Sequence, residues 1–369
     1  MTRPTTYWDY LRLQELLALQ GGVERNEEAI DGEEVLFITV HQVFELLFKL
    51  VARELRAARE LFGQALVHED RIAGAVESLR RVQTIFRCAT GHFEIIETLG
   101  LREYLEFRDS LMPASGYQSF QLRQIEALLG LEESQRIPLG AHRAPLDALR
   151  EPDGSEGYAL RAVRTELDSD EPSVKVAIER WLARTPIDGV PVDQEGADEA
   201  LEAFVERYLD AHARETDGTL AHAQTLAGSD AERERLAAMY EREKEGARAF
   251  LRPSEAEGGN ERMRIRAAMT FIETYRELPL LTWPRQVLAA LLEVEQAFLI
   301  FRQRHARMVE RVIGRRTGTG GSDGVDYLDR TALTYRIFSD LWAVRTMMVR
   351  RAAAPPLERE AYYGFRSVE

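Results

Sequence analysis

Apolar residues recur with the spacing of an α-helix along most of the chain, and this pattern restricts the fold more than any other feature. Between residues 37 and 62 the apolar positions, together with His41, fall on one helical face. The alternation typical of half-buried strands is nearly absent. We therefore predict an all-α fold with a helical-bundle core. The other strong helices are expected at 72–99, 119–129, 287–314 and 329–351.

The middle of the chain differs in composition. Residues 131–259 are richer in Asp, Glu, Gly and Pro than the rest, although helical stretches remain within them. We predict a smaller helical subdomain at 131–259, inserted into a core made of 1–130 and 260–369. Its helices are expected at 174–184, 197–212 and 231–251, and the charges of the last indicate a solvated helix face.

Charge and cysteine content exclude several classes of function. The chain has 369 residues, 45% of them hydrophobic, and a formal net charge of -14, which disfavours a nucleic-acid partner. No basic amphipathic stretch favours an anionic membrane. The single cysteine, Cys88, excludes an internal disulfide and a cysteine-based zinc or iron–sulfur site. The N-terminus has no apolar signal core, and no run approaches the roughly 20 apolar residues of a membrane span. We therefore expect a soluble, cytoplasmic protein.

Two histidines far apart in the sequence, His41 and His305, lie on the apolar faces of predicted helices. A lone histidine in such a place is most often a hydrogen-bonded core residue. Two of them, without a third ligand, do not make a zinc site. One iron ligand and one polar group on another wall are, however, the composition of a haem pocket. The sequence therefore predicts that these two helices line a haem pocket.

Two shorter features allow more than one interpretation. Tyr104 and Arg108 are one helical turn apart, and Arg108 is either a surface residue or a guanidinium fork for a substrate carboxylate. The glycine-rich stretch 318–324 is either a flexible connector or a mobile lid, in which Thr319 would reach a ligand. It matches neither the phosphate-binding loop nor the dinucleotide fingerprint.

Taken together, these segments resemble the tryptophan 2,3-dioxygenase family. The resemblance begins at Tyr-Trp-Asp-Tyr-Leu-Arg-Leu (7–13), includes 37–49 and 107–130, and resumes from about 266 to 351. Residues 131–259 resemble the extra helical subdomain of the longer, animal-type members, most clearly in Trp-Leu-Ala-Arg-Thr-Pro (181–186).

The resemblance implies insertion of O₂ across the indole C2–C3 bond of L-tryptophan to give N-formylkynurenine, the first step of tryptophan degradation by the kynurenine route. It implies haem b with iron on the proximal His305, the distal His41 as catalytic residue, and a homotetramer with exchanged N-terminal segments. The implied haem contacts are Ser115, Gly116 and Val309. The implied substrate contacts are Phe37, Ile38, Thr39, Val40, His41, Tyr104, Arg108 and Thr319, with Tyr7 and Tyr10 from a neighbouring subunit.

Three positions depart from the family pattern. Leu47 and Phe301 each stand where the family usually has tryptophan, and Asp323 adds a negative charge to the glycine-rich loop. Two other functions therefore stay open. One is a related haem monooxygenase that oxidises a substituted tryptophan or indole without opening the ring. The other is a haem-binding sensor without catalysis, which would not need the carboxylate clamp of Arg108 and Thr319.

Overall fold

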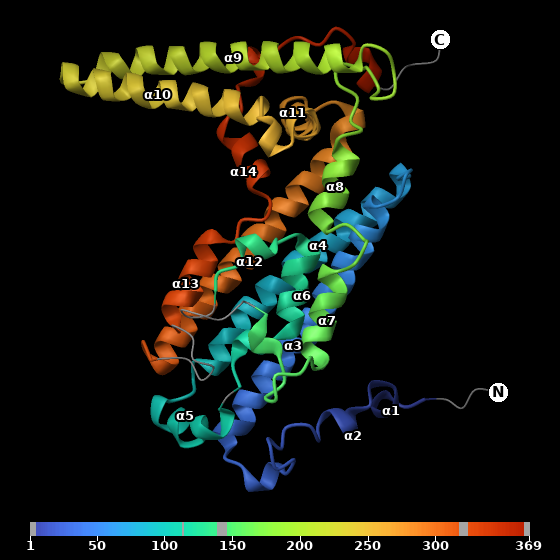
Figure 1. Cartoon of the computed structure of the whole chain (residues 1–369), viewed down its shortest axis with the longest axis vertical. Helices are drawn as coiled ribbons and strands as arrows, with labels where there is room; N and C mark the ends of the chain where they lie inside the picture. The colour runs from blue at the N-terminus through green and yellow to red at the C-terminus, as the bar shows by residue number, and fades with distance from the viewer. Residues whose placement is uncertain (1–4, 113, 139–145, 317–323, 365–369) are drawn as a thin grey trace. The chain divides into compact units, whose positions relative to one another are not determined.

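A computed structural model describes residues 5–112, 114–138, 146–316 and 324–364 (Figure 1). Over these residues it contains fourteen α-helices, nine short 3-10 helices and no β-strand. The one β-type contact among them is an isolated bridge between Ile187 and Val190. The prediction of an all-α fold is confirmed.

The α-helices occur along the whole described chain, with connections of very different length. In chain order they are α1 (Tyr7–Leu11), α2 (Leu13–Leu16), α3 (Gly32–Phe62), α4 (Glu69–Ile96), α5 (Leu101–Phe107), α6 (Phe120–Leu129), α7 (Tyr158–Leu167), α8 (Val174–Leu182), α9 (Ala197–Leu226), α10 (Asp230–Leu251), α11 (Gly259–Thr274), α12 (Thr282–Ile313), α13 (Val325–Thr334) and α14 (Ser339–Thr346).

The chain divides into two compact units. Unit 1 consists of Met1–Arg56, Arg80–Asp170 and Val294–Arg336, and unit 2 of Ala57–Leu79, Glu171–Glu293 and Ile337–Glu369. Helices α3, α4 and α12 each supply residues to both units. These boundaries differ from those of the expected insert, because residues 131–170 belong to unit 1. A separate inserted subdomain at 131–259 stays a prediction.

Local sequence signals account for the ends of α6. Ser119 caps its first turn, with the hydroxyl oxygen accepting a hydrogen bond from Leu122 N at 3.4 Å. Gly130 ends the helix with φ of 112°, a left-handed conformation that glycine adopts without steric cost. The predicted helix at 119–129 is thus confirmed nearly to the residue.

The predicted single helix at 329–351 is wrong. Helix α13 ends at Thr334, and α14 begins only at Ser339. Between them Tyr335, Ile337 and Phe338 are all buried, at 6%, 5% and 5% exposure. The backbone leaves the helical conformation at Tyr335 (φ -75°, ψ 85°) and at Phe338 (φ -99°, ψ 45°) while both side chains stay buried, so tertiary packing overrides the local helical pattern.

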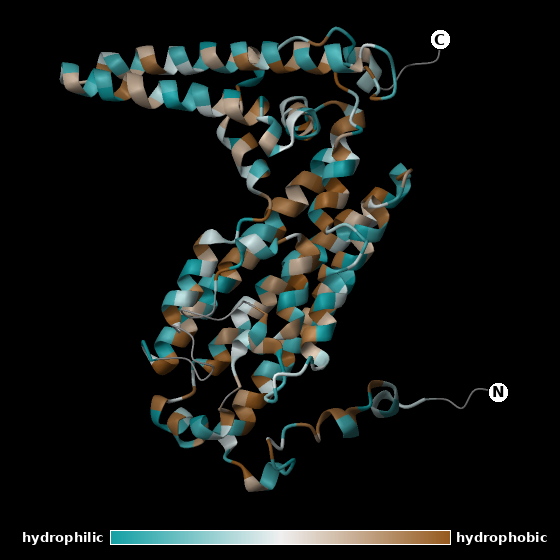
Figure 2. Cartoon of the chain, viewed as in Figure 1, coloured by the Kyte–Doolittle hydropathy of each residue, from teal (hydrophilic) through white to brown (hydrophobic). Residues whose placement is uncertain are grey.

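Helices α9 and α10 pack against each other as an antiparallel hairpin in unit 2 (Figure 1). Hydrophilic and hydrophobic residues alternate along both helices (Figure 2). The charged run on α10 is largely exposed and forms ion pairs, such as Lys244 with Asp217 at 2.9 Å and with Glu241 at 2.8 Å. The interpretation of this run as a solvated helix face is confirmed.

Helix α3 corrects one expectation about membranes. By length and composition it is the one helix among the described residues that could cross a membrane, although no run of that kind was expected. Val51 and Leu55 are fully buried, as in a core helix. Leu46 and Leu50, by contrast, are 48% and 49% exposed. A second apolar face of α3 is therefore open in the single chain.

In unit 2, the C-terminal segment is held to the turn that contains Asp188. The Asp188 carboxylate accepts hydrogen bonds from the backbone N–H groups of Glu358 and Arg359, at 2.9 and 3.1 Å, and from Arg207 Nη2 at 2.8 Å. Tyr363 donates its hydroxyl hydrogen to the Pro186 carbonyl at 2.7 Å. Asp188 has a positive φ of 48°, so its backbone is held in a conformation that costs energy for most residues.

We predict that Asp188→Ala lowers the free energy of unfolding by about 3–5 kcal/mol, because it removes the partner of a half-buried guanidinium and of two N–H groups. Asp188→Asn should cost only about 1–2 kcal/mol, since asparagine keeps an acceptor and tolerates positive φ. The measurement is urea unfolding, with the exposed Asp193→Ala as control. Equal stability of Asp188→Ala and the control would contradict this role.

Candidate functional site

Helix α3 places Phe37 and His41 on one face, with ring centroids 4.1 Å apart. His41 Nδ1 lies 2.7 Å from the Phe37 carbonyl oxygen. A carbonyl oxygen only accepts, so Nδ1 carries the hydrogen and Nε2 of the neutral ring is an acceptor. Burial lowers the pKa of His41, and its hydrogen bond to Phe37 opposes this only in part. This wall of the site therefore offers an acceptor for a ligand N–H group.

Helix α5 adds aromatic residues to the same wall. The rings of Phe107 and Tyr104 lie 5.6 and 6.2 Å from that of Phe37, and both side chains are buried. Arg108 follows directly and is partly buried. Burial raises the pKa of Tyr104, while the charge of Arg108 and a hydrogen bond to it act in the opposite direction. A group of aromatic side chains next to a guanidinium suits a flat aromatic ligand that carries a carboxylate.

Helix α12 supplies the second wall through His305. Its ring is parallel to that of Phe93, with centroids 5.4 Å apart and an interplanar angle of 3°. Burial, and to a smaller extent His41 and the nearby charges of Arg123 and Arg302, lowers the pKa of His305 to about 4. The imidazole is therefore neutral near pH 7, the form that ligates iron.

A short chain of aromatic contacts connects the two histidines within unit 1. Phe44 lies 6.3 Å from His41 and 4.8 Å from Phe93, measured between ring centroids, and Phe93 stacks on His305. The structure therefore brings together two histidines that are 264 positions apart in the sequence. Three helices, α3, α4 and α12, supply these side chains.

A buried carboxylate and three arginines lie near His305. Glu126 is fully buried, and its Oε1 accepts from Arg302 Nη2 at 2.6 Å and forms an ion pair with Arg123 at 3.3 Å. Its Oε2 accepts from Arg136 Nη1 at 2.6 Å. Burial acts to raise the pKa of Glu126, but the three positive charges outweigh it and bring the pKa to about 2. We call these four residues the arginine cluster.

The arginine cluster has two positive charges in excess and several donors to spare. Four buried atoms have no hydrogen-bond partner among the described residues: Arg123 Nε, Arg136 Nε and Nη2, and the Tyr327 hydroxyl oxygen. Buried polar groups are nearly always paired, so these atoms fit a further anionic group. Since Arg123 and Arg302 affect the pKa of His305, the excess charge lies close to that residue. The two carboxylates of haem b have the chemistry that this cluster would accept.

The predicted haem contacts Ser115 and Gly116 lie in a turn beside the arginine cluster. Ser115 caps the short helix Gly116–Gln118, and its hydroxyl oxygen accepts from Tyr117 N at 3.3 Å. The Arg123 guanidinium lies 4.8 Å above the Tyr117 ring. The turn therefore places Ser115 and Gly116 close in sequence to an aromatic residue that contacts the cluster.

Other predicted site residues differ in exposure. Val40 is 3% exposed, and Ile38 and Val309 are partly buried. Thr39 is exposed and donates its hydroxyl hydrogen to the Val35 carbonyl at 2.8 Å, so within this chain its side chain bonds along its own helix. Thr319 lies outside the described residues, as does Asp323 in the same loop.

Tyr7 and Tyr10 are on α1 and are 71% and 77% exposed. Neither α1 nor α2 has a buried residue. Within a single chain these tyrosines thus face outward, and their predicted contact with a site concerns a neighbouring copy.

Two of the three departures from the family pattern can be located. Phe301 is 3% exposed and lies between Phe93 and Phe86, with ring centroids at 5.1 and 5.8 Å. It therefore fills its position in the aromatic core one turn before His305. Leu47 is partly buried on α3.

Sequence reasoning missed the arginine cluster and Tyr327. One signal was available: Arg123 and Glu126 are three residues apart on a helix whose other buried residues are apolar, and Arg302 is three residues before His305. Charged residues at positions where a helix should be apolar indicate a buried polar network. Which of them pair could not be read from the pattern.

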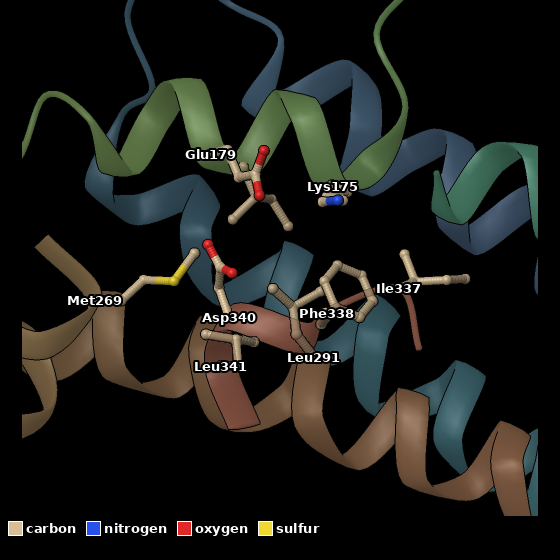
Figure 3. Close-up of a pocket in the computed structure, with 9 residues that line it drawn as sticks. Lys175, Glu179, Met269, Leu291, Ile337, Phe338, Asp340 and Leu341 are labelled. Atoms are coloured by element: carbon tan, nitrogen blue, oxygen red, sulfur yellow. The ribbon is translucent and has the colours of Figure 1, made fainter. Parts of the chain in front are cut away.

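A small cavity in unit 2 is not a second candidate (Figure 3). It has room for roughly one water molecule. Its two carboxylates are already paired: Arg262 Nη1 donates to Glu179 at 2.8 Å, and Arg266 Nε donates to Asp340 at 2.9 Å. No predicted site residue lines it. Over the described residues there is also no group of three or more His, Cys, Asp or Glu side chains that could hold a metal ion.

Comparison with known proteins gives one consistent family. A family model described as tryptophan 2,3-dioxygenase matches residues 1–348. A protein of Sorangium cellulosum named tryptophan 2,3-dioxygenase is 50% identical, over 99% of this chain and 89% of its own length. Tryptophan 2,3-dioxygenase 2 of Ralstonia nicotianae is 47% identical over 98% of each chain. The similarity extends to an insect protein, tryptophan 2,3-dioxygenase of Aedes aegypti, which is 31% identical over 96% of this chain and 88% of its own.

We predict that Glu126→Gln lowers the free energy of unfolding of the protein without haem by about 3–5 kcal/mol, because it leaves three buried guanidinium groups without their counter-charge. The pKa of Glu126 falls from 4.5 to about 2 on folding, so its contribution to stability is present above pH 4.5 and is lost as the pH falls toward 2. The difference in the free energy of unfolding between Glu126→Gln and the wild type should therefore become smaller as the pH falls from 4.5 toward 2.

The measurement for Glu126→Gln is denaturant unfolding at several pH values. The exposed Glu133→Gln, at the start of a short helix in the same unit, is the control and should change stability by less than about 0.5 kcal/mol. A Glu126→Gln variant as stable as this control at pH 7 would show that the cluster does not need its carboxylate.

Proposed function

The chain belongs to the tryptophan 2,3-dioxygenase family, and we propose that its reaction takes place beside His41, with haem b held by His305. It is an oxidoreductase, a dioxygenase that inserts O₂ across the indole C2–C3 bond of L-tryptophan to give N-formylkynurenine. One observation carries the placement: two neutral histidines are joined by aromatic contacts and lie beside the aromatic residues of α5 and the arginine cluster.

The residues around His305 fit haem. The neutral imidazole is suited to ligate its iron, and the unpaired donors of Arg123, Arg136 and Tyr327 are suited to its two carboxylates. Ser115, Gly116 and Val309 are proposed to line it. When bound, haem supplies the chemistry with O₂, while the protein supplies binding, orientation and exclusion of water.

His41 has a positioning role in this proposal. Its Nε2 is the acceptor for the indole N–H, since Nδ1 is already committed to the Phe37 carbonyl. Phe37, held 4.1 Å from the His41 ring, packs on the indole. Because the indole N–H is very weakly acidic, His41 orients the substrate and is not assigned as an obligatory base. Ile38, Thr39 and Val40 belong to the same helical segment.

Arg108 binds the carboxylate of the amino acid in this proposal. A guanidinium presents two parallel N–H donors to a carboxylate, and the buried Tyr104 beside it helps to fix its position. Thr319 is proposed to bind the ammonium and carboxylate groups from the loop that follows α12. The fixed carboxylate and indole N–H define the plane of the ring, so the reacting C2–C3 bond is held in one orientation.

The quaternary structure is proposed to be a homotetramer in which Tyr7 and Tyr10 complete the site of a neighbouring copy. Tyr7, Trp8 and Tyr10 are all more than 60% exposed, and large exposed apolar patches usually mark protein–protein contacts. The open face of α3 at Leu46 and Leu50 fits the same explanation. Contact of this face with another copy, not with a membrane, is part of the proposal. The unpaired, exposed Cys88 fits a reducing cytoplasm.

The direct test is aerobic turnover of the reduced, haem-loaded protein with L-tryptophan, with the product analysed by mass spectrometry. Addition of two oxygen atoms with ring opening supports the proposal. Addition of one oxygen atom would mean a monooxygenase, and haem binding without turnover of any indole would mean a sensor. Sedimentation velocity of the same sample tests the tetramer.

We predict that His305→Ala loses stable haem binding, because it removes the one residue that this proposal assigns to hold the iron. The measurement is the haem content per chain together with the ferrous absorption spectrum. His222→Ala is the control, since this residue is exposed, and it should keep full haem content. A His305→Ala variant with the wild-type spectrum would overturn the assignment.

We predict that Arg108→Leu weakens apparent affinity for L-tryptophan roughly 30- to 5000-fold, because an unpaired carboxylate in a desolvated site costs about 2–5 kcal/mol. Haem content should not change. Tryptamine, which lacks the carboxylate, should be nearly as poor a substrate for the wild type as L-tryptophan is for the variant.

Steady-state kinetics with both compounds test the role of Arg108, and Arg102→Leu on the exposed side of α5 is the matched control. If the wild type accepts tryptamine as well as L-tryptophan, Arg108 does not bind the carboxylate.

A further inference from the structure

Gln42 follows His41 directly and has no role in the reaction described above. Its side-chain amide nevertheless makes two specific contacts. Nε2 donates to the Leu19 carbonyl at 2.9 Å, and Oε1 accepts from Gln20 Nε2 at 2.7 Å. Gln20 Nε2 also donates to the Leu16 carbonyl at 3.0 Å, so both of its amide hydrogens are used. Gln20 is only 8% exposed. We call the pair Gln20 and Gln42 the amide clamp.

A tight turn begins at the clamp and leads back to α3. Asn26 N donates to the Gly21 carbonyl at 3.0 Å, and a side chain at Gly21 would place its Cβ 2.4 Å from the same nitrogen. Gly22 has φ of +62°, which favours glycine. The turn thus needs both glycines. We call residues 5–19 the N-terminal arm, and the turn fixes the point at which this arm leaves the rest of the chain.

The N-terminal arm beyond the clamp has little support from its own chain. No residue of α1 or α2 is buried, and the exposed fractions of Leu17 and Leu19 are 68% and 62%. The clamp is therefore where a mostly exposed segment is fastened to the helix that carries His41.

We propose that Gln42 is a positioning residue that, together with Gln20, fixes the base of the N-terminal arm to the His41 helix and so sets where the arm meets a second copy of this chain. The contact of the arm with a second copy rests on the function proposed above. The attachment of the arm to α3 rests on the hydrogen bonds of the clamp. The contact also links the arm to His41, because Gln42 and His41 are adjacent on α3.

The physical effect is on the length of the free segment. With the clamp intact, Tyr10 is 10 residues from the fixed point at Gln20, and with the clamp open it is 22 residues from the start of α3 at Gly32. The effective concentration of a tethered segment falls with about the 3/2 power of its length, which gives roughly a threefold loss. One net hydrogen bond alone corresponds to roughly a 2- to 10-fold change in an equilibrium, so we expect a total loss between roughly three- and tenfold.

The experiment uses full-length, haem-loaded protein and the variants Gln42→Leu and Gln20→Leu. Gln303→Leu is the matched control, because Gln303 is an exposed glutamine on α12 only two residues from His305. The readouts are hydrogen exchange of residues 5–18 in the assembled protein and the separate kcat and KM for L-tryptophan.

Both clamp variants are expected to show exchange in the N-terminal arm roughly 3- to 10-fold faster than the wild type, and KM raised by a similar factor with kcat nearly unchanged. Gln20→Leu should have the smaller effect, because the bond from Gln42 Nε2 to the Leu19 carbonyl remains in that variant. The double variant should be close to Gln42→Leu, which already removes both bonds that Gln42 makes to residues 19 and 20. The control should match the wild type. Unchanged arm exchange and KM in both variants would overturn the proposal, as would faster exchange spread evenly over α3, α4 and α12.

The two proposals can fail separately. A wild type that sediments as a monomer, or that does not turn over L-tryptophan, contradicts the proposed function. Faster exchange confined to the arm of Gln42→Leu would support the clamp in that case too, because this readout does not depend on catalysis.

Discussion

The structure of the candidate site depends on one buried carboxylate. Glu126 holds three guanidinium groups that come from α6, from Arg136 in the loop after α6, and from α12. A buried ion cluster of this kind contributes little net stability compared with apolar packing, so stability alone does not explain it. What it provides is position: Arg302 is fixed one turn before His305, between the rings of Phe298 and Tyr335. The segment of α12 that carries His305 is thereby held with one orientation.

The same cluster also affects the protonation of the site. Its excess positive charge lowers the pKa of His305, in addition to the larger effect of burial. An anionic partner near the cluster would compensate that charge and oppose this part of the pKa shift, while burial, the larger effect, would still favour the neutral imidazole. On the other wall, the Phe37 carbonyl sets the tautomer of His41, so a backbone atom determines what a side chain can recognise. Both histidines are thus neutral imidazoles, but their surroundings suit His41 to accept a hydrogen bond from an N–H group and His305 to ligate a metal.

The sequence predicted a helix correctly where its apolar residues follow a single helical face. The periodic segments at 37–62 and 119–129 became α3 and α6, and Phe37 and His41 share a face because they are four residues apart. The break at Tyr335 was not predictable, since neither glycine nor proline marks it. There the Tyr335 hydroxyl accepts from Ile137 N at 3.0 Å, a contact between residues 198 positions apart. The pairing of Glu126 with Arg302 was hidden for the same reason.

The Gln42 position shows what a spacing pattern leaves out. In a helix, the residue after His41 projects about 100° around the axis, so it cannot line the same wall as Phe37 and His41. Glu45 lies on another part of α3, and its carboxylate and backbone carbonyl both accept from Gln121 Nε2 at 2.8 Å, which ties α3 to α6. Three side chains of the segment 41–45 therefore have different partners. His41 lines the site, Gln42 bonds to the base of the N-terminal arm, and Glu45 bonds to α6. A change at either of the last two would reach the site by moving the helix that carries His41, and not by altering the chemistry of its ring.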